Sequence, residues 1–117
     1  MARKSQEIRP PKNLLVRVLF LKEGDAWVAQ CLEYDIAAQA KTLPEAEQAF
    51  ERTLVGQIML DLRRGKEPFS GTKPAPRMYW RKFNEGLGLR MEPTIELPKQ
   101  TPPAFMIEEI RKEARVA

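Results

Sequence analysis

The stretch that decides the fold runs from Leu14 to Cys31 and reads LLVRVLFLKEGDAWVAQC. Its first part, to Leu21, is dense in side chains that favour strands. Residues 22–25 predict a hairpin turn, and a second strand follows from Ala26. Side chains alternate between the two faces of a strand, so one face of the hairpin is apolar and the other is mixed. The apolar face holds Val18, Phe20, Trp27, Ala29 and Cys31, and the mixed face holds Arg17, Leu19, Val28 and Gln30.

A weaker third strand is predicted from Ile36 to Ala40, and an amphipathic helix follows it. Thr42 and Glu45 have the spacing of a capping box, and Gly65 is a natural helix stop. The helix carries one apolar stripe at three- and four-residue spacing. The prediction is an α+β fold in which a three-stranded antiparallel sheet packs against one helix (β-β-β-α). The stripe consists of Ala46, Ala49, Phe50, Thr53, Leu54, Gln57 and Ile58.

The remainder of the chain is less regular. Pro and Gly residues make 66–76 a connector, and the aromatic segment 78–83 predicts a short helix that ends at Gly86. Short strands are predicted at 87–91 and 94–97, and Thr101-Pro102 predicts the start of a terminal helix. The expected organisation is a flexible N-terminal lead (1–12), a ββ(β)α domain (13–65) and a C-terminal extension (66–117).

Composition excludes several kinds of chemistry. The 117 residues include no histidine and one cysteine, so histidine-based catalysis, imidazole zinc sites and an internal disulfide are excluded. Cys31 falls on the apolar face, where an inert structural thiol is expected. The apolar run Val18 to Leu21 is far too short to cross a membrane. These features predict a cytoplasmic protein without cofactor or metal.

The positive charge of the chain lies in its flanks. The formal net charge is +4, yet residues 13–65 hold six basic and eight acidic side chains, and the basic excess falls in 1–12 and 66–117. Charge scattered in this way carries no base-specific information, so a solvated surface is favoured over a nucleic-acid-reading arm.

The stretch from Trp27 to Phe50 resembles the HicB-like antitoxin family. The resemblance rests on the aromatic-Val-Ala strand at Trp27, on Cys31-Leu32-Glu33, on Gln39-Ala40-Lys41-Thr42 and on Glu45-Ala46, and it covers about residues 14–64. It implies a three-stranded antiparallel sheet followed by a helix, often with a further strand, in a partial RNase H-like arrangement. It also implies that the protein works by binding another protein and has no catalytic residues.

The implied partner is a HicA-like toxin, a small RNA-cleaving protein with a basic surface. The acidic core of the present chain complements such a surface. The mixed sheet face is too apolar to stay in water, so it must meet the C-terminal segment, a second copy or a partner protein. A homo-oligomer, either dimer or tetramer, is expected. The expected partner-binding residues are Glu23, Asp25, Glu33, Asp35, Arg17, Leu19 and Val28.

Two alternatives remain open. A nucleic-acid-binding regulator would use the C-terminal extension, with 94–98 as a ribbon strand and Thr101 to Val116 as the following helix; its candidate contacts are Arg77, Trp80, Arg81 and Lys82. A metal-dependent nuclease would need converging carboxylates, one of them in the middle of the first strand, where this chain has only Arg17. In both cases we favour the plainer interpretation, in which the aromatic residues dock the extension onto the sheet and the acids keep loops soluble.

Overall fold

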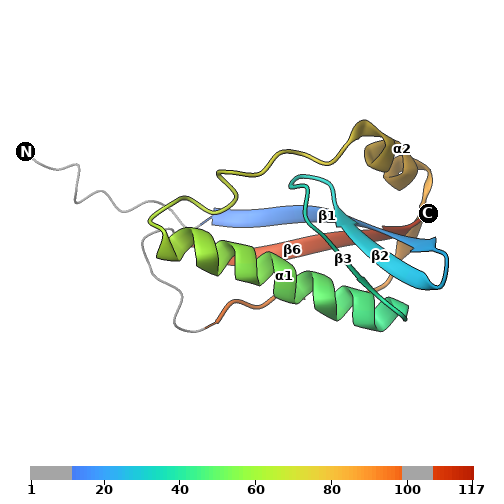
Figure 1. Ribbon diagram of the computed structural model, residues 1–117, viewed down its shortest axis with the longest axis horizontal. Helices are drawn as coiled ribbons and strands as arrows, with labels where there is room; N and C mark the ends of the chain where they lie inside the picture. The colour runs from blue at the N-terminus through green and yellow to red at the C-terminus, as the bar shows by residue number, and fades with distance from the viewer. Residues whose placement is uncertain (1–11, 99–106) are drawn as a thin grey trace, which may run out of the picture.

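The computed structural model describes residues 12–98 and 107–117. Over these residues the chain forms one six-stranded mixed sheet and two helices (Figure 1). The predicted α+β class is confirmed, but the sheet is larger than the three strands expected. Apart from Lys12, the predicted N-terminal lead lies outside the described residues. The elements in chain order are β1 (Lys12–Glu23), β2 (Ala26–Cys31), β3 (Ala37–Ala40), α1 (Leu43–Arg63), α2 (Arg77–Glu85), β4 (Leu87–Leu89), β5 (Thr94–Ile95) and β6 (Ile107–Val116).

The strands follow the order β3-β2-β1-β6-β4, and β5 pairs with β6 beside this path. The β1–β2 hairpin is antiparallel, and Glu23 pairs with Ala26 across the turn Gly24-Asp25. Gly24 has a φ of 61°, a left-handed conformation that glycine adopts without strain. β3 continues the antiparallel pattern on the far side of β2. The predicted strand-turn-strand-strand arrangement is therefore confirmed.

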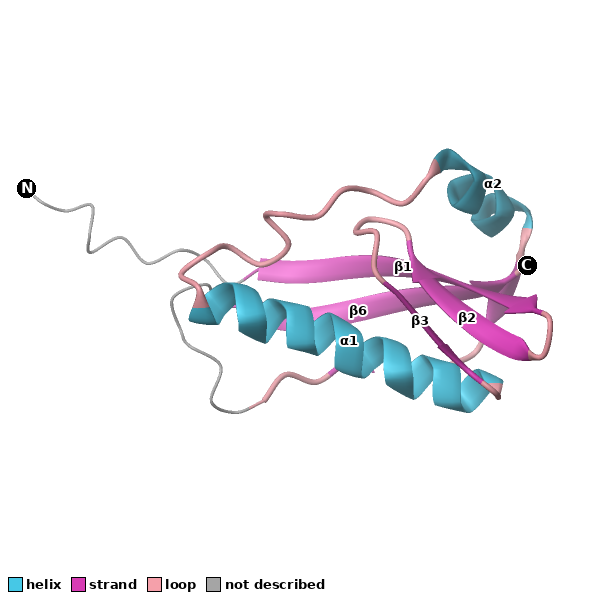
Figure 2. Cartoon of the chain, viewed as in Figure 1, coloured by secondary structure: helices cyan, strands magenta, loops and turns pink. Residues whose placement is uncertain are grey.

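The face of the sheet that α1 covers, here called the inner face, holds the main core. Figure 2 shows α1 running along the length of β1 and β6. The apolar stripe of α1 meets the apolar face of the hairpin, as the sequence predicts, except that Thr53 of the predicted stripe is exposed. The fully buried members of this core are Val16, Val18, Phe20, Ala29, Cys31, Ala46, Phe50, Leu54, Ile58 and Ile110.

The ends of α1 follow the sequence signals. Thr42 is the N-cap: its Oγ1 accepts a hydrogen bond from Glu45 N at 3.3 Å and donates to Glu45 Oε1 at 3.0 Å. Past the last turn, Gly65 has a φ of 71° and its N–H donates to the carbonyl of Leu62. Within the described residues, neither helix combines the length and the apolar character that a membrane span requires.

The opposite, outer face of the sheet is partly covered by the C-terminal extension. Phe83 of α2 and Ala75 of the connector pack on Leu19, Leu21 and Leu32 in a second buried cluster. The connector is itself tied to α1, because buried Asp61 accepts a hydrogen bond from Phe69 N at 2.8 Å. The predicted short aromatic helix is thus confirmed, and it docks on the apolar part of the outer face.

The predicted terminal helix from Thr101 to Val116 is wrong over its described part, and residues 101–106 lie outside the described residues. Ile107–Val116 forms β6, which pairs in parallel with β1. The segment is rich in the helix formers Glu, Lys, Arg and Ala, and Ile107, Ile110 and Ala114 recur at helical spacing. Backbone pairing with β1 and β5 overrides this local preference, so the ribbon-plus-helix interpretation of 94–116 fails with it.

Lys112 interrupts the alternation of apolar and polar side chains by which β6 could be recognised as a strand. It lies on the inner face, between Ile110 and Ala114, where an apolar side chain is expected. Its side chain is 1% exposed, and its Nζ forms ion pairs with Glu47 and Glu51 of α1. Two carboxylates therefore satisfy the buried ammonium group, and the helix and the last strand are joined by charge as well as by apolar packing.

Candidate interaction surface

Among the described residues, α2 and the connector leave uncovered the part of the outer face formed by the facing side chains of β1 and β6. Register places Leu15 beside Arg111 and Arg17 beside Glu113. We call these four residues the outer patch. Leu15 is 56% exposed, which is unusual for a leucine in the middle of a sheet, and the charges around it are of both signs. The outer patch thus combines one exposed apolar side chain with charges of both signs, a mixed composition that a protein partner can contact.

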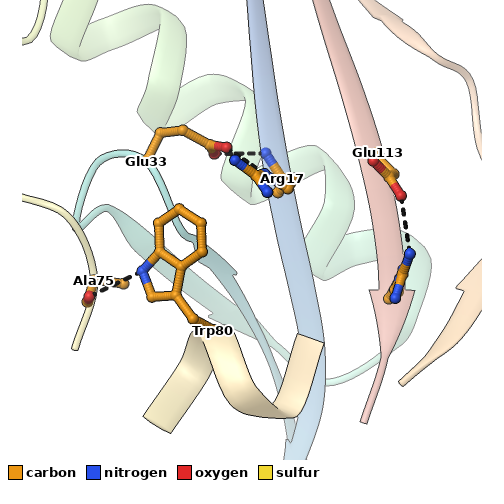
Figure 3. A network of polar contacts seen from close by, with 6 residues as sticks. Arg17, Glu33, Ala75, Trp80 and Glu113 are labelled. Carbon is orange, nitrogen blue, oxygen red and sulfur yellow. Dashed lines mark hydrogen bonds and ion pairs between the residues drawn. The ribbon is translucent and has the colours of Figure 1, made fainter. Parts of the chain in front are cut away.

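Arg17 is held by contacts from two directions (Figure 3). Its backbone N–H donates to Glu33 Oε1 at 2.7 Å, and its side-chain Nε donates to Glu33 Oε2 at 2.6 Å. Its guanidinium lies over the ring of Trp80, 4.8 Å from the ring centroid. Trp80 is in turn positioned by a hydrogen bond from its Nε1 to the carbonyl of Ala75, at 3.1 Å. Two of the predicted binding residues, Arg17 and Glu33, are thus brought together by the fold.

The other predicted binding residues do not form one patch. Asp35 lies near Glu33 and accepts a hydrogen bond from Gln30 Nε2 at 2.9 Å. Glu23 and Asp25 lie at the β1–β2 turn, which is the opposite end of the hairpin from the loop that carries Glu33 and Asp35. The four predicted acids therefore fall into two separate pairs. Among the residues that the structure describes, no group of three or more His, Cys, Asp or Glu side chains could hold a metal ion.

Leu19 and Val28, which sequence reasoning also placed on the partner surface, lie beneath the C-terminal extension. Leu19 is fully buried and Val28 is half-buried against the same cluster. Both side chains belong to the apolar cluster that Phe83 of α2 and Ala75 of the connector complete. The sequence correctly indicated that this apolar surface needs cover, and the C-terminal segment is one of the three covers it allowed.

Sequence reasoning missed the β6 residues of the surface. Arg111 donates to Glu109 at 3.3 Å, and Arg115 donates to Glu113 at 3.3 Å. Arg115 also lies over the ring of Phe83, 4.6 Å from its centroid, and donates to the carbonyl of Phe83. The charged outer-face residues of β6 alternate with its inner-face residues, and this alternation was the sequence signal for a strand. Lys112 obscured the signal because it is a charged residue on the inner face.

The candidate nucleic-acid residues on α2 divide between the surface and the interior. Arg77, Arg81 and Lys82 are exposed, whereas Trp80 is half-buried and turned toward Arg17. One face of the Trp80 ring is therefore occupied by a guanidinium of the chain itself. This arrangement matches the expectation that the aromatic residues dock the segment while its basic side chains stay in water.

Cys31 has the environment of a structural thiol. It is fully buried in the main core. Burial disfavours the thiolate and raises the pKa of Cys31 from 9.0 to about 11. The thiol is therefore protonated at neutral pH and has little nucleophilic character, as the sequence analysis expected.

A groove of about 840 Å³ runs between α1 and the segment that contains β5. Its apolar lining comes from Val55, Ile95 and Leu97, and its charged lining is three glutamates and one arginine: Glu51, Glu92, Glu96 and Arg52. None of the predicted binding residues lines it, so the groove and the outer patch are separate features of the surface.

Comparison of the chain with protein-family models, with curated proteins and with solved structures found no match.

Proposed function

We propose that the protein is a non-catalytic antitoxin of the HicB-like type, or an orphan relative of that family, which acts by binding a HicA-like RNA-cleaving toxin. The arrangement β1-β2-β3-α1 supports this proposal, because it corresponds to the sheet and helix that the family resemblance implies. β6 lies beside β1, outside the residues that carry the resemblance, and we assign it the place of the further strand that many members of the family have. The proposal places the protein in the cytoplasm, with the RNA that such a toxin cleaves.

The observation that carries the non-catalytic part of the proposal is the position of Arg17. Metal-dependent cleavage of a phosphodiester on this kind of scaffold requires a carboxylate in the middle of the first strand. Here that strand carries a guanidinium, which pairs with Glu33 and so occupies one of the nearby acids as well. A fixed positive charge at this point repels a divalent cation. The geometry therefore favours binding over catalysis.

The outer patch favours a protein partner over a nucleic acid. Its two arginines, Arg17 and Arg111, each pair with a carboxylate of the same face, which offsets their attraction for phosphate. Leu15 offers an exposed apolar contact, and the buried centre of a protein interface is more apolar than the rest of the protein surface. The nucleic-acid alternative has less support, because Trp80 is turned inward and the helix expected after residue 101 is replaced by β6 where it is described.

The proposal is tested by co-expression with the short basic proteins encoded next to this gene. We expect one of them to copurify with the chain and to lose its RNA-cleaving activity when the chain is added in stoichiometric amount. A complex with none of these proteins would overturn the antitoxin assignment. RNA or DNA cleavage by the chain alone with Mg²⁺ or Mn²⁺, abolished in Asp35→Asn, would overturn the non-catalytic assignment.

A matched pair of variants tests the surface itself. Leu15→Glu places a charge in the outer patch, and we expect it to weaken toxin inhibition at least tenfold, because the carboxylate would be desolvated in the complex. Leu87→Glu is the control, since Leu87 is 73% exposed on β4, outside the outer patch. Equal inhibition by both variants would show that the toxin binds elsewhere.

A further inference from the structure

The groove between α1 and the segment that contains β5 has an apolar floor. One wall is α1, and the other wall is residues 94–98, which include β5. Ile95 is buried in the main core, and Val55 and Leu97 are half-buried against that core. All three side chains also line the groove, whose volume of about 840 Å³ is in the range of pockets that bind a ligand.

The α1 wall of the groove contains a glycine, Gly56. It lies in the interior of α1, where glycine weakens a helix relative to alanine. A Cβ atom added at Gly56 would meet no atom of the described residues within 4 Å. Packing within the described chain therefore does not require a glycine at this position. Without a side chain, the helix backbone is open here to close approach by an occupant of the groove.

The rim of the groove is acidic. Glu92 and Glu96 are exposed on the β5 side, and neither forms an ion pair with another described residue. On the α1 side, Glu51 is paired with Lys112. Against these acids, the described lining holds one basic side chain, that of Arg52. The groove is thus locally acidic on a chain whose formal net charge is +4.

The charge of the groove restricts its occupant. Exposed carboxylates repel phosphate groups, so a nucleic acid or an anionic lipid is disfavoured. Among the residues that the structure describes, no three acids lie close enough together to hold a metal ion. A second copy of the chain, related by a twofold axis at the groove, would bring acid against acid. The remaining occupant is one that combines cationic groups with apolar surface.

We propose that this groove is a docking site for a segment of a partner protein in which apolar side chains alternate with lysine or arginine. The apolar side chains of the segment pack on Val55 and Leu97, and its backbone passes over Gly56. Its basic side chains pair with Glu92 and Glu96. The groove is separate from the outer patch, so this proposal does not depend on the proposed function.

The test uses the full chain and a short, fluorescently labelled peptide of alternating lysine and leucine. Fluorescence anisotropy measures the dissociation constant, and we expect saturable binding of one peptide per chain. A peptide of equal length with serine in place of leucine is expected to bind at least about tenfold more weakly, because it lacks the apolar contacts. A peptide with glutamate in place of lysine is expected not to bind.

The acidic rim is tested by reversal of charge. Glu92→Lys and Glu96→Lys are each expected to raise the dissociation constant of the lysine–leucine peptide about tenfold, because each places like charges opposite each other. Glu85→Lys is the matched control. It makes the same change of charge on an exposed residue of α2 that does not line the groove, and it should leave the dissociation constant unchanged.

The glycine is tested by Gly56→Leu. The added side chain lies in the path of the bound segment, so we expect the dissociation constant to rise at least about tenfold. The same change should raise the midpoint of urea denaturation, because leucine favours a helix more than glycine does. Loss of binding together with a gain in stability cannot come from unfolding. Gln48→Leu, at an exposed position of α1 outside the groove, is the control and should leave binding unchanged.

Three results would overturn the proposal. The first is no saturable binding of the lysine–leucine peptide, or equal binding of the serine peptide, which would show attraction to surface charge alone. The second is binding that Glu92→Lys, Glu96→Lys or Gly56→Leu leaves unchanged, because the peptide would then lie elsewhere. The third is association of the chain with itself, seen by sedimentation equilibrium without peptide and abolished by Glu96→Lys, because the occupant would then be a second copy.

Discussion

β2 and β6 both pair with β1, but they are stabilised in different ways. β2 follows β1 after a tight turn, and its inner-face residues Ala29 and Cys31 pack on α1 as a sequence pattern predicts. β6 pairs with the other side of β1 from the far end of the chain, and its inner face includes the buried Lys112. A strand next to its partner in sequence can be recognised from alternation alone. A distant strand can carry a charged residue on its inner face when another element supplies the opposite charges.

The largest effect is expected in the apolar core shared by the hairpin and α1. Phe50 is fully buried on the stripe of α1. Phe50→Ala removes a large apolar side chain and leaves a cavity, so we expect the free energy of unfolding to fall by about 3–5 kcal/mol. Urea denaturation provides the measurement, and Gln48→Ala, an exposed change on the same helix, is the control. A loss as small as that of the control would contradict the packing of α1 described above.

The charged contact of β6 is expected to contribute somewhat less. Lys112→Met keeps the apolar volume of the side chain but leaves Glu47 and Glu51 without their common partner. We expect a loss of about 2–3 kcal/mol, below the cost of a fully buried unpaired charge, because the two glutamates are 21% and 30% exposed. Amide hydrogen exchange should increase in β6 more than in β2.

A triple variant separates the charge from the packing at this contact. Lys112→Met combined with Glu47→Gln and Glu51→Gln removes all three charges, and most of the lost stability should return. Lys82→Met, on the exposed surface of α2, is the control for loss of a lysine. If the triple variant were less stable than Lys112→Met alone, the ion pairs would not be the reason why β6 tolerates a lysine.

The buried thiol of β2 predicts a dependence of stability on pH. The pKa of Cys31 is raised to about 11 in the folded chain from 9.0, so the unfolded chain loses its proton first as the pH rises. Stability should therefore fall between pH 9 and pH 11, by roughly 2 kcal/mol in total. In Cys31→Ala this part of the pH dependence should disappear. Burial also raises the pKa of Tyr34, which acts in the same direction, so both series are measured in a Tyr34→Phe background.

The smallest effect is expected at the start of α1. Thr42→Ala removes the side-chain cap from Glu45 N and should cost about 1 kcal/mol in thermal or urea unfolding. Thr53 is the matched control, because its hydroxyl donates to the carbonyl of Ala49 within the exposed middle of the same helix. Thr53→Ala should leave stability unchanged or slightly increased. Equal losses in the two variants would show that the cap contributes nothing specific.

The candidate surface was predictable only in part. Arg17 and Glu33 were recognised as surface residues, but their ion pair depends on how the loop after β2 returns to β1. The contact of Arg17 with Trp80 requires α2 to dock across a connector that sequence pattern does not orient. Arg111 and Glu113 were missed, because their segment has the composition of a helix.

The amino-acid sequence by itself determined the hairpin, the third strand and the capped helix α1. Each depends on turn, capping and alternation signals among residues close together in the chain, and the energies involved are local. Only the tertiary structure decided that Ile107–Val116 is a strand, because its backbone pairs with β1 and its buried lysine finds two carboxylates on α1. It also decided which part of the outer face α2 covers, since the position of α2 depends on apolar contacts with strands far away in sequence.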